Sequence, residues 1–515
     1  MRHSKERPLR PGAAPAALVF VLGLASVAAL VGGRPADGGG ATLSTAPPDP
    51  RLAAALHQLI DADPATTAEL LAGPVAHRDR RYVAPLIELL RPTPGAKRAE
   101  VAKALAALTG ETLGNGWQDW VEWLGERRDV PLPAELATWK GDLYARFIDR
   151  RFKRFLDSRR PSRLRIELVE WGGVKVDGIP ALDGPKLIDA AAATYLTPGD
   201  EVFGVSILGD ARAYPLRILD WHEIVNDVVG GMPVSLTYCA LCGSGVLYRT
   251  TVSGTTYSFG TSGLLYESNK LMYDRQTESL WNQLTGEAVN GPLASRRLEL
   301  ERLPVVVTSW KSWLAENPGT RVLSPATGFE RDYAPGRAYG NYAASPYTMF
   351  PVARRSQALP AKSRVFAIVV DGAAKAYPLD RLATRPVVHD TLSGHAVLVV
   401  REPGSEAVRA YDPGNHTFLP ELSSDGGSLR LREEATRASW RLLEEGLVGP
   451  AGETLPRLPG HLAYWFGWFS FFPSTLIYGV DPASPGPATH SESITGSPSR
   501  SAGPRLPDRQ ADAGC

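Results

Sequence analysis

The chain lacks several features that would point directly to a class of function. Its 515 residues include 56 basic and 55 acidic side chains, so the net charge is only +1, and its body has no strong basic run. This balance gives no electrostatic support to nucleic-acid binding. The sequence also has no G-x-S-x-G motif, no phosphate-binding P-loop and no dinucleotide fingerprint. The common signatures of serine hydrolases and nucleotide-binding proteins are therefore missing.

Cysteine is scarce as well, and its distribution is informative. Only three cysteines are present, and Cys515 is the final residue of a tail rich in Ser, Pro, Gly and Ala. The other two, Cys239 and Cys242, form a Cys-x-x-Cys pair in the run Thr-Tyr-Cys-Ala-Leu-Cys-Gly-Ser-Gly. A thiol pair with this spacing binds a metal, cycles through a disulfide or locks a tight turn. The chain thus has one place for sulfur chemistry.

The first residues have the pattern of an export signal. Basic residues precede a nearly uninterrupted apolar run from 13 to 31; they are Arg2, Lys5, Arg7 and Arg10. An apolar run of about 19 residues behind a positive flank is typical of a signal peptide or a single membrane anchor. Residues 1–31 are therefore predicted to be one of these, and 32–48 a flexible linker. The body is expected in the cell envelope, secreted, periplasmic or attached to the membrane by this one transmembrane helix.

Residues 49–157 have the apolar spacing of short helices separated by Pro and Gly, which favours a HEAT-like helical module. Trp117, Trp120 and Trp123 would line one helical face, either as packing core or as a surface for a protein partner. Residues 481–515 are predicted to be a disordered tail. No other partner is indicated.

The β-rich remainder contains an internal repeat, which predicts an α+β fold with two lobes. The 33 residues that start at Val202 align without a gap with those that start at Val365, an offset of 365 − 202 = 163, and 13 pairs are identical. The first repeat is assigned to 158–335 and the second to 336–480. The aromatic run 464–480 is expected to be a packed helix, because its counterpart 305–324 carries charged residues that do not suit a bilayer.

The cysteines are predicted to lie in a turn between two strands, as in a zinc knuckle. A zinc ribbon needs a second cysteine pair, so a metal here would require other ligands. The nearest are His222 and Glu223, as ligands or as a general base beside a thiolate. The candidate catalytic residues are therefore Cys239, Cys242, His222 and Glu223, and the candidate metal ligands are Cys239, Cys242 and His222. A bound zinc, copper or iron ion would suit this set.

The site is expected in the first repeat only. In the second repeat Glu402 and Ser405 replace the cysteines, and Arg385 replaces His222. Polar residues near the motif are the candidates for cofactor binding; they are Asn226, Asp227, Tyr238, Asp274 and Arg275. The alternative for the last two is a helix cap and an ion pair around the buried Trp281.

Three interpretations of the cysteine pair stay open. The first is a metal-binding or redox site, including the special case of a cysteine nucleophile with His222 as its base. The second is a structural disulfide in a non-enzymatic binding or scaffold protein, although such small rings are strained. The third is a pair of inert buried thiols.

Six motifs in order resemble a bacterial family, domain of unknown function 3179. They are Trp171-Gly172-Gly173-Val174, Asp177-Gly178-Ile179-Pro180, Arg212-Ala213-Tyr214-Pro215-Leu216, His222-Glu223-Ile224-Val225-Asn226-Asp227, Thr237-Tyr238-Cys239-Ala240-Leu241-Cys242-Gly243 and Tyr273-Asp274-Arg275-Gln276-Thr277. The family usually has proline after the first cysteine, where this chain has Ala240. The resemblance covers about 148–478 and implies an exported or membrane-attached bacterial protein, without implying a particular reaction.

Overall fold

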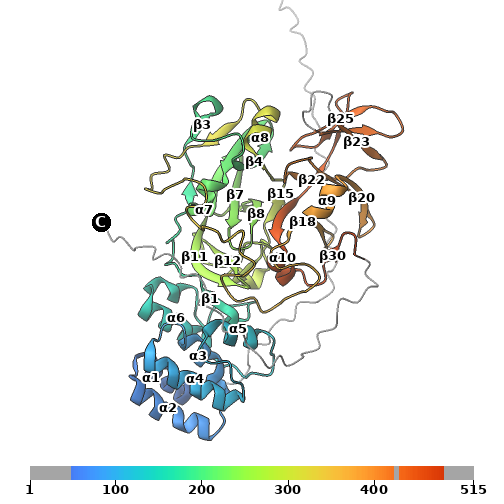
Figure 1. Ribbon diagram of the computed structural model, residues 1–515. Helices are drawn as coiled ribbons and strands as arrows, with labels where there is room; N and C mark the ends of the chain where they lie inside the picture. The colour runs from blue at the N-terminus through green and yellow to red at the C-terminus, as the bar shows by residue number, and fades with distance from the viewer. Residues whose placement is uncertain (1–47, 423–428, 481–515) are drawn as a thin grey trace, which may run out of the picture. The chain divides into compact units, whose positions relative to one another are not determined.

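The computed structural model describes residues 48–422 and 429–480 of the chain. The predicted signal or anchor (1–31), all but the last residue of the predicted linker, the predicted tail (481–515) and Cys515 lie outside these ranges. Within them the chain forms helices first and mostly strands afterwards (Figure 1). The predicted α+β class is confirmed.

Residues 48–147 are helical because the sequence supplies caps as well as apolar periodicity. The α-helices here are α1 (Pro50–Asp61), α2 (Pro64–Ala76), α3 (Val83–Leu89), α4 (Gly95–Thr109), α5 (Trp117–Gly125) and α6 (Leu136–Phe147). Asp49 caps α1, where its carboxylate accepts hydrogen bonds from the amides of Arg51 and Leu52 at 3.1 and 3.2 Å. Gly110 ends α4 in the left-handed region, with a φ of 81°.

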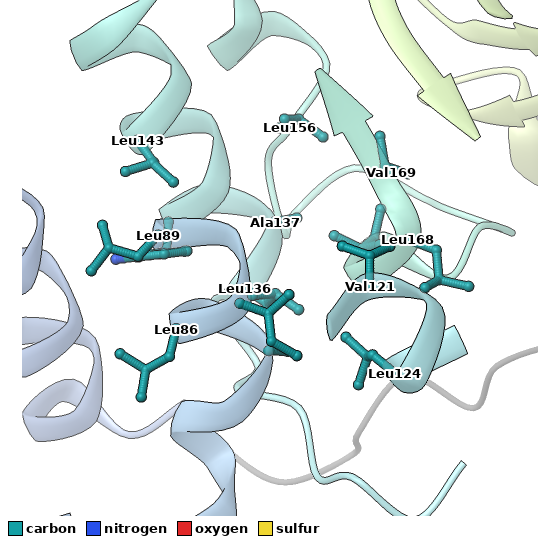
Figure 2. Close-up of a cluster of buried hydrophobic side chains, with 14 of the residues drawn as sticks. Leu86, Leu89, Val121, Leu124, Leu136, Ala137, Leu143, Leu156, Leu168 and Val169 are labelled. Atoms are coloured by element: carbon teal, nitrogen blue, oxygen red, sulfur yellow. The ribbon is translucent and has the colours of Figure 1, made fainter. Parts of the chain in front are cut away.

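These helices bury an apolar core that continues into the first strand. Figure 2 shows part of it, in which side chains of α3, α5 and α6 surround Leu168 and Val169. Trp120 and Trp123 belong to this core, and Trp117 packs against it half-buried. The interpretation of these tryptophans as packing core is confirmed. Short 3-10 turns complete the helical content; they are η1 (Arg80–Tyr82), η2 (Arg150–Arg154), η3 (Ile166–Leu168), η4 (Ala190–Ala192) and η5 (Ala294–Arg296).

Residues 169–323 form mostly antiparallel sheets. The first sheet has its strands side by side in the order β1 (Val169–Trp171), β11 (Phe259–Tyr266), β12 (Asn269–Asp274), β13 (Leu280–Asn282) and β14 (Ala288–Asn290). The second has the order β15 (Glu301–Leu303), β8 (Ser244–Arg249), β7 (Met232–Cys239), β6 (Ile224–Val229) and β2 (Leu182–Asp183). The third has the order β16 (Val306–Ser309), β4 (Glu201–Ile207), β5 (Asp210–Pro215), β17 (Arg321–Leu323) and β3 (Leu187–Asp189). A short ribbon pairs β9 (Thr251–Val252) with β10 (Thr255–Thr256). Helices α7 (Leu216–His222) and α8 (Trp310–Glu316) connect strands of these sheets.

The described residues of 364–477 form three further sheets, again mostly antiparallel. One sheet has the strand order β29 (Gly460–Tyr464), β18 (Arg364–Val370), β19 (Ala373–Pro378) and β30 (Leu476–Ile477). The next has the order β20 (Val387–Leu392), β21 (His395–Arg401), β22 (Val408–Tyr411) and β28 (Arg457–Leu458). The last has the order β23 (Phe418–Leu422), β24 (Leu429–Glu433), β25 (Ser439–Leu442), β26 (Leu447–Val448) and β27 (Thr454–Leu455). The helices are α9 (Leu379–Thr384) and α10 (Trp465–Phe471). A single apolar cluster contains residues of both halves, among them Phe203, Tyr214, Phe366 and Tyr377, so the halves share one core.

The aromatic run 464–480 forms α10 and the short strand β30. Trp465 and Trp468 are 1% and 0% exposed, and both pack against β18 and β19. The prediction of a packed helix is confirmed. Within residues 48–422 and 429–480, none of the helices has both the length and the apolar character needed to cross a membrane.

Candidate functional site: a buried thiol pair beside a lysine–glutamate ion pair

The cysteines occupy the turn between β7 and β8, as the sequence predicts. Cys239 is the last residue of β7, and the amide of Cys242 donates to the carbonyl of Cys239 at 3.1 Å. Gly243 follows with a φ of 56°, and a Cβ there would lie 3.0 Å from the ring of Tyr464. Only glycine meets both requirements without strain. The amide of Tyr464 donates to the carbonyl of Cys242 at 2.7 Å, so strand β29 closes one side of the turn.

Both thiols are free and buried. Cys239 is 2% exposed and Cys242 is fully buried. They belong to an apolar cluster whose other buried members are Leu241, Leu265, Tyr342, Phe350, Val352, Tyr464 and Phe466. Packing against Cys242 is tight, because a Cβ added to Gly467 would lie 3.1 Å from its sulfur. The pair is therefore enclosed by side chains from both halves of the β-region.

A buried ion pair lies beside the thiols. The ammonium of Lys270 is 2.8 Å from Oε2 of Glu223, and the two side chains are 5% and 9% exposed. Lys270 also donates to the carbonyl of Tyr238 at 3.2 Å, which places its charge next to Cys239 along the chain. The hydroxyl of Tyr339 donates to the second oxygen of Glu223 at 2.5 Å. The Lys270 ammonium, the Glu223 carboxylate and the Tyr339 hydroxyl therefore all have partners, as burial demands.

The two thiols differ in acidity. Burial raises the pKa of Cys239, but the hydrogen bond with Cys242, the charge of Lys270 and the amide of Lys270 together bring it below its ordinary value, against the opposing charge of Glu223. Burial is the main reason that the pKa of Cys242 lies well above its ordinary value, and the interaction with Cys239 adds to it. Cys242 also lies with its sulfur 3.4 Å from the carbonyl oxygen of Ser268. The first cysteine is thus the better thiolate and the second is held as a thiol.

Local structure positions both members of the ion pair. Glu223 follows α7 with a left-handed φ of 57°, where its amide bonds the carbonyl of Leu219 and its carbonyl accepts from Tyr238. Lys270 is on β12, a strand whose residues are all buried. Sequence reasoning found Glu223 and missed Lys270, and the available signal was a lysine directly before the apolar run Leu271-Met272-Tyr273. Tyr339 and Tyr342 were also missed, because they lie about 100 residues downstream in a segment with no regular structure.

His222 makes its hydrogen bonds away from the sulfurs. Its Nδ1 is 2.8 Å from the carbonyl of Pro180, and its Nε2 is 2.6 Å from the hydroxyl of Tyr333. Burial lowers the pKa of His222, so the ring is held neutral. With both nitrogens engaged, the predicted roles of His222 as metal ligand or base gain no support from this arrangement.

The candidate cofactor-binding residues of β6 and β7 have structural partners. Asn226 donates to Asp183 at 2.7 Å and to the carbonyl of Phe259 at 2.8 Å. Asp227 accepts from Arg212 and from Tyr214, at 2.7 and 2.8 Å. Tyr238 is buried, and its carbonyl receives Lys270. Of this group only Tyr238 belongs to the surroundings of the thiols.

Asp274 and Arg275 lie at the end of β12 and make local contacts. The carboxylate of Asp274 is fully buried and accepts hydrogen bonds from Thr277, Ser279 and Trp281. Arg275 forms an ion pair with Asp183 at 2.8 Å. The ion pair and the buried Trp281 agree with the predicted alternative, but the predicted helix cap is wrong, because Asp274 bonds the turn between β12 and β13.

The described residues offer few ligands to a metal ion. In that part of the chain, no group of three or more His, Cys, Asp and Glu side chains is arranged to hold one. Cys239 and Cys242 are the two residues of the predicted ligand set that lie together. A separate cavity of about 370 Å³ lies between β15 and β29 and is lined by residues that include Arg302, His461 and Trp468, but by none of the predicted site residues.

The comparison with protein families confirms the resemblance seen in the motifs. The model of the family described as Protein of unknown function (DUF3179) matches residues 176–475, which is more than half of the chain and includes both cysteines, Glu223 and Lys270. No curated protein and no solved structure matches the chain. This chain therefore belongs to the DUF3179 family of proteins of unknown function.

Proposed function

We propose that Cys239 and Cys242 form a redox-active dithiol that exchanges electrons with a disulfide-bearing substrate. The observation that carries this proposal is the unequal pair: two free thiols in one turn, with Lys270 acting on the first of them. A lowered pKa at the first cysteine of a Cys-x-x-Cys motif is typical of dithiols that react by exchange. A structural staple needs no such charge, and inert thiols need no buried lysine.

The arrangement assigns a role to each thiol. The thiolate of Cys239 attacks one sulfur of the substrate disulfide, and the other substrate sulfur leaves as a thiolate. Cys242 then loses its proton and attacks the Cys239 sulfur of this mixed disulfide. The substrate leaves with both sulfurs reduced, and a Cys239–Cys242 disulfide remains. Two electrons pass from the protein to the substrate, and the reverse sequence oxidises a substrate dithiol.

Lys270 and Glu223 set the charge at this centre. The ammonium of Lys270 favours the thiolate of Cys239, whereas the carboxylate of Glu223 disfavours it. Because the pair is buried, its charges are screened less than surface charges. The negative charge of Glu223 also raises the pKa of Cys242. The catalytic set proposed is therefore Cys239 and Cys242, with Lys270 and Glu223 as positioning residues.

The β-region is proposed to be a tandem duplication with one active lobe. Its support is the repeated topology: the hairpin β4–β5 with α7 corresponds to β18–β19 with α9, and β16 pairs with β4 as β29 pairs with β18. Side-chain bonds are repeated too: Trp313 to Thr320 at 2.8 Å and Trp468 to Thr475 at 3.0 Å, Tyr214 to Asp227 at 2.8 Å and Tyr377 to Asp390 at 3.0 Å. The second lobe has Glu402 and Ser405 in place of cysteines and supplies Tyr464 as a wall of the site.

The remaining parts of the chain have proposed roles of their own. The helices of 49–157 are proposed to be a HEAT-like module that binds a protein partner. The cell-envelope location rests on the pattern of residues 1–31, and it would give the dithiol an oxidising environment. In that setting the protein would meet substrate disulfides directly.

The test is a redox titration of the full chain in a Cys515→Ser background. The protein is equilibrated in buffers of reduced and oxidised glutathione, quenched with acid and weighed intact, and an unquenched sample is weighed under native conditions. We expect a reversible two-electron transition with a mass difference of about 2 Da, lost in Cys239→Ser, and a glutathione adduct that persists in Cys242→Ser. A disulfide that resists reduction in the folded protein would instead support the structural staple. Extra mass seen only under native conditions would support a bound zinc, copper or iron ion.

A further inference from the structure

The two halves of the β-region are joined by a long segment without helix or strand. It consists of residues 324–363, between β17 and β18, and is called here the cover segment. Connections of this length without secondary structure are uncommon inside compact domains and are often functional loops. This one crosses the surroundings of the thiol pair.

Three tyrosine hydroxyls attach the cover segment to the residues of the thiol site. Tyr333 bonds Nε2 of His222 at 2.6 Å, Tyr339 bonds Glu223 at 2.5 Å, and Tyr342 donates to the carbonyl of Leu241 at 2.9 Å. Leu241 is between the two cysteines in the turn. The segment therefore bonds the end of α7, through His222 and Glu223, and the centre of the cysteine turn.

Apolar side chains of the same segment cover the sulfurs. Phe350 and Val352 are 4% and 2% exposed and belong to the cluster that contains Cys239 and Cys242. Beyond them the segment is anchored, since the amides of Ala353 and Arg354 donate to the carboxylate of Glu267 at 2.8 and 3.3 Å. Phe350 and Val352, which cover the thiols, thus lie between the anchored residues Ala353 and Arg354 and the three tyrosines earlier in the segment.

The rest of the segment is held weakly. Between 325 and 349 most residues are exposed, and only Ala338 and Tyr342 are buried, at 9% and 8% exposure. Gly328, Gly336 and Gly340 have positive φ values and open space around them. A stretch with few buried apolar contacts and no ladder of backbone hydrogen bonds opens at a lower free energy than the sheets beneath it.

We propose that the cover segment is a gate over the dithiol, which opens locally to admit a substrate disulfide and is held closed by Tyr339 and Tyr342. This inference rests on the proposed function for its purpose. Its physical basis is the enclosure: exchange requires a substrate sulfur to reach Cys239, and at 2% exposure no substrate atom reaches it while the segment is closed. The other enclosing side chains, Leu265, Tyr464 and Phe466, lie on β11, β29 and α10, which are regular elements.

The test measures how fast the thiols react with 5,5′-dithiobis(2-nitrobenzoic acid) in the folded, reduced full chain, in a Cys515→Ser background. The double variant Tyr339→Phe/Tyr342→Phe removes two hydrogen bonds and should speed labelling at least about tenfold. Tyr342→Phe alone, which leaves the ion pair untouched, should speed it in the same direction. Tyr347→Phe is the matched control, since Tyr347 is in the same segment and is 68% exposed; its rate should not change.

Labelling at low urea concentrations shows whether the opening is local. A gate predicts a rate that is nearly independent of urea below the unfolding transition, because little surface is exposed on opening. A rate that rises with the full slope of global unfolding, or equal rates in all variants, would refute the gate. If the thiols are labelled through a local opening but the protein does not cycle in glutathione buffers, the gate stands and the proposed function is refuted. Reversible redox cycling with equal exchange rates in wild type and double variant would support the proposed function and refute the gate.

Discussion

Replacing Lys270 by Gln should make Cys239 less acidic and slow its reaction at low pH. The substitution removes the positive charge next to Cys239 and leaves Glu223, whose negative charge opposes the thiolate. Both effects have the same sign. The pH at which the reactivity of Cys239 reaches half its maximum should therefore move upwards. Glu223→Gln removes the opposing charge, keeps a polar partner for Lys270, and should move the midpoint downwards.

The size of the effect follows from the placement of the charge. Lys270 bonds the carbonyl of Tyr238, the residue before Cys239, and we assume a separation on the order of 7 Å between its ammonium and the Cys239 sulfur. At an effective dielectric of about 20, a unit charge at that distance contributes about 2 kcal/mol, roughly a thirtyfold change in the ionisation constant of the thiol. Since a more basic thiolate is also a better nucleophile, with a Brønsted slope near 0.5, the net rate at low pH should fall about fivefold.

The assay is the rate of alkylation by iodoacetamide between pH 5 and 10 in Cys242→Ser/Cys515→Ser chains, so that only Cys239 reacts. Lys140→Gln is the control, because Lys140 bonds Glu88 at 2.7 Å and Tyr144 bonds the other oxygen of Glu88 at 2.5 Å, the same buried arrangement far from the thiols. Breaking either pair should destabilise the fold by a similar amount, roughly 3 kcal/mol. An unchanged midpoint in Lys270→Gln, or an equal change in Lys140→Gln, would refute the electrostatic role.

Three further predictions test other parts of the structure. Gly467→Ala should destabilise the fold by about 1 to 3 kcal/mol in urea melts and loosen Cys242, because its Cβ would lie 2.9 Å from the Cβ of that residue; Gly319→Ala, with open space around it, should be neutral. Asp274→Asn should cost about 2 to 3 kcal/mol in the same melts while thiol labelling in the folded state keeps its rate, since its contacts are structural; altered labelling would indicate a role in the site. Burial lowers the pKa of His461 to about 3, below its unfolded value of about 6.5. The stability that the neutral ring contributes is therefore complete above pH 6.5 and is lost as the pH falls, because the unfolded chain binds the proton first. Between pH 7 and pH 5 the free energy of unfolding of the wild type should fall by about 2 kcal/mol more than that of His461→Phe, and parallel losses would contradict this.

The order of strands and helices follows from local signals in the sequence. Asp49 and Pro50 mark the start of α1, and the turn residues Gly209 and Gly372 separate paired strands in both halves. The match between these two stretches also predicts that they have the same local structure, and the hairpins β4–β5 and β18–β19 do. The sheet β23 to β27 lies outside the 33 aligned residue pairs, so that alignment alone does not predict its strands.

The candidate site was predictable only in part, for a physical reason. Cys239, Cys242 and Glu223 belong to one strand–turn unit, so their proximity is a local property of the sequence. Lys270 reaches them across a neighbouring sheet, and Tyr339 and Tyr464 arrive from still further along the chain. Contacts of this kind depend on how sheets pack, which no spacing rule encodes. The engagement of His222 by Tyr333 is likewise a long-range contact.

The contact between Tyr464 and the cysteine turn has a consequence for the order of synthesis. The wall that Tyr464 provides is 464 − 242 = 222 residues downstream of Cys242. At typical elongation rates the cysteines leave the ribosome roughly 10 to 45 s before that wall exists. During this interval the nascent chain presents both thiols to any oxidant, metal or chaperone that it meets. The oxidation state of the mature protein therefore depends on what the unfinished chain encounters as well as on the finished fold.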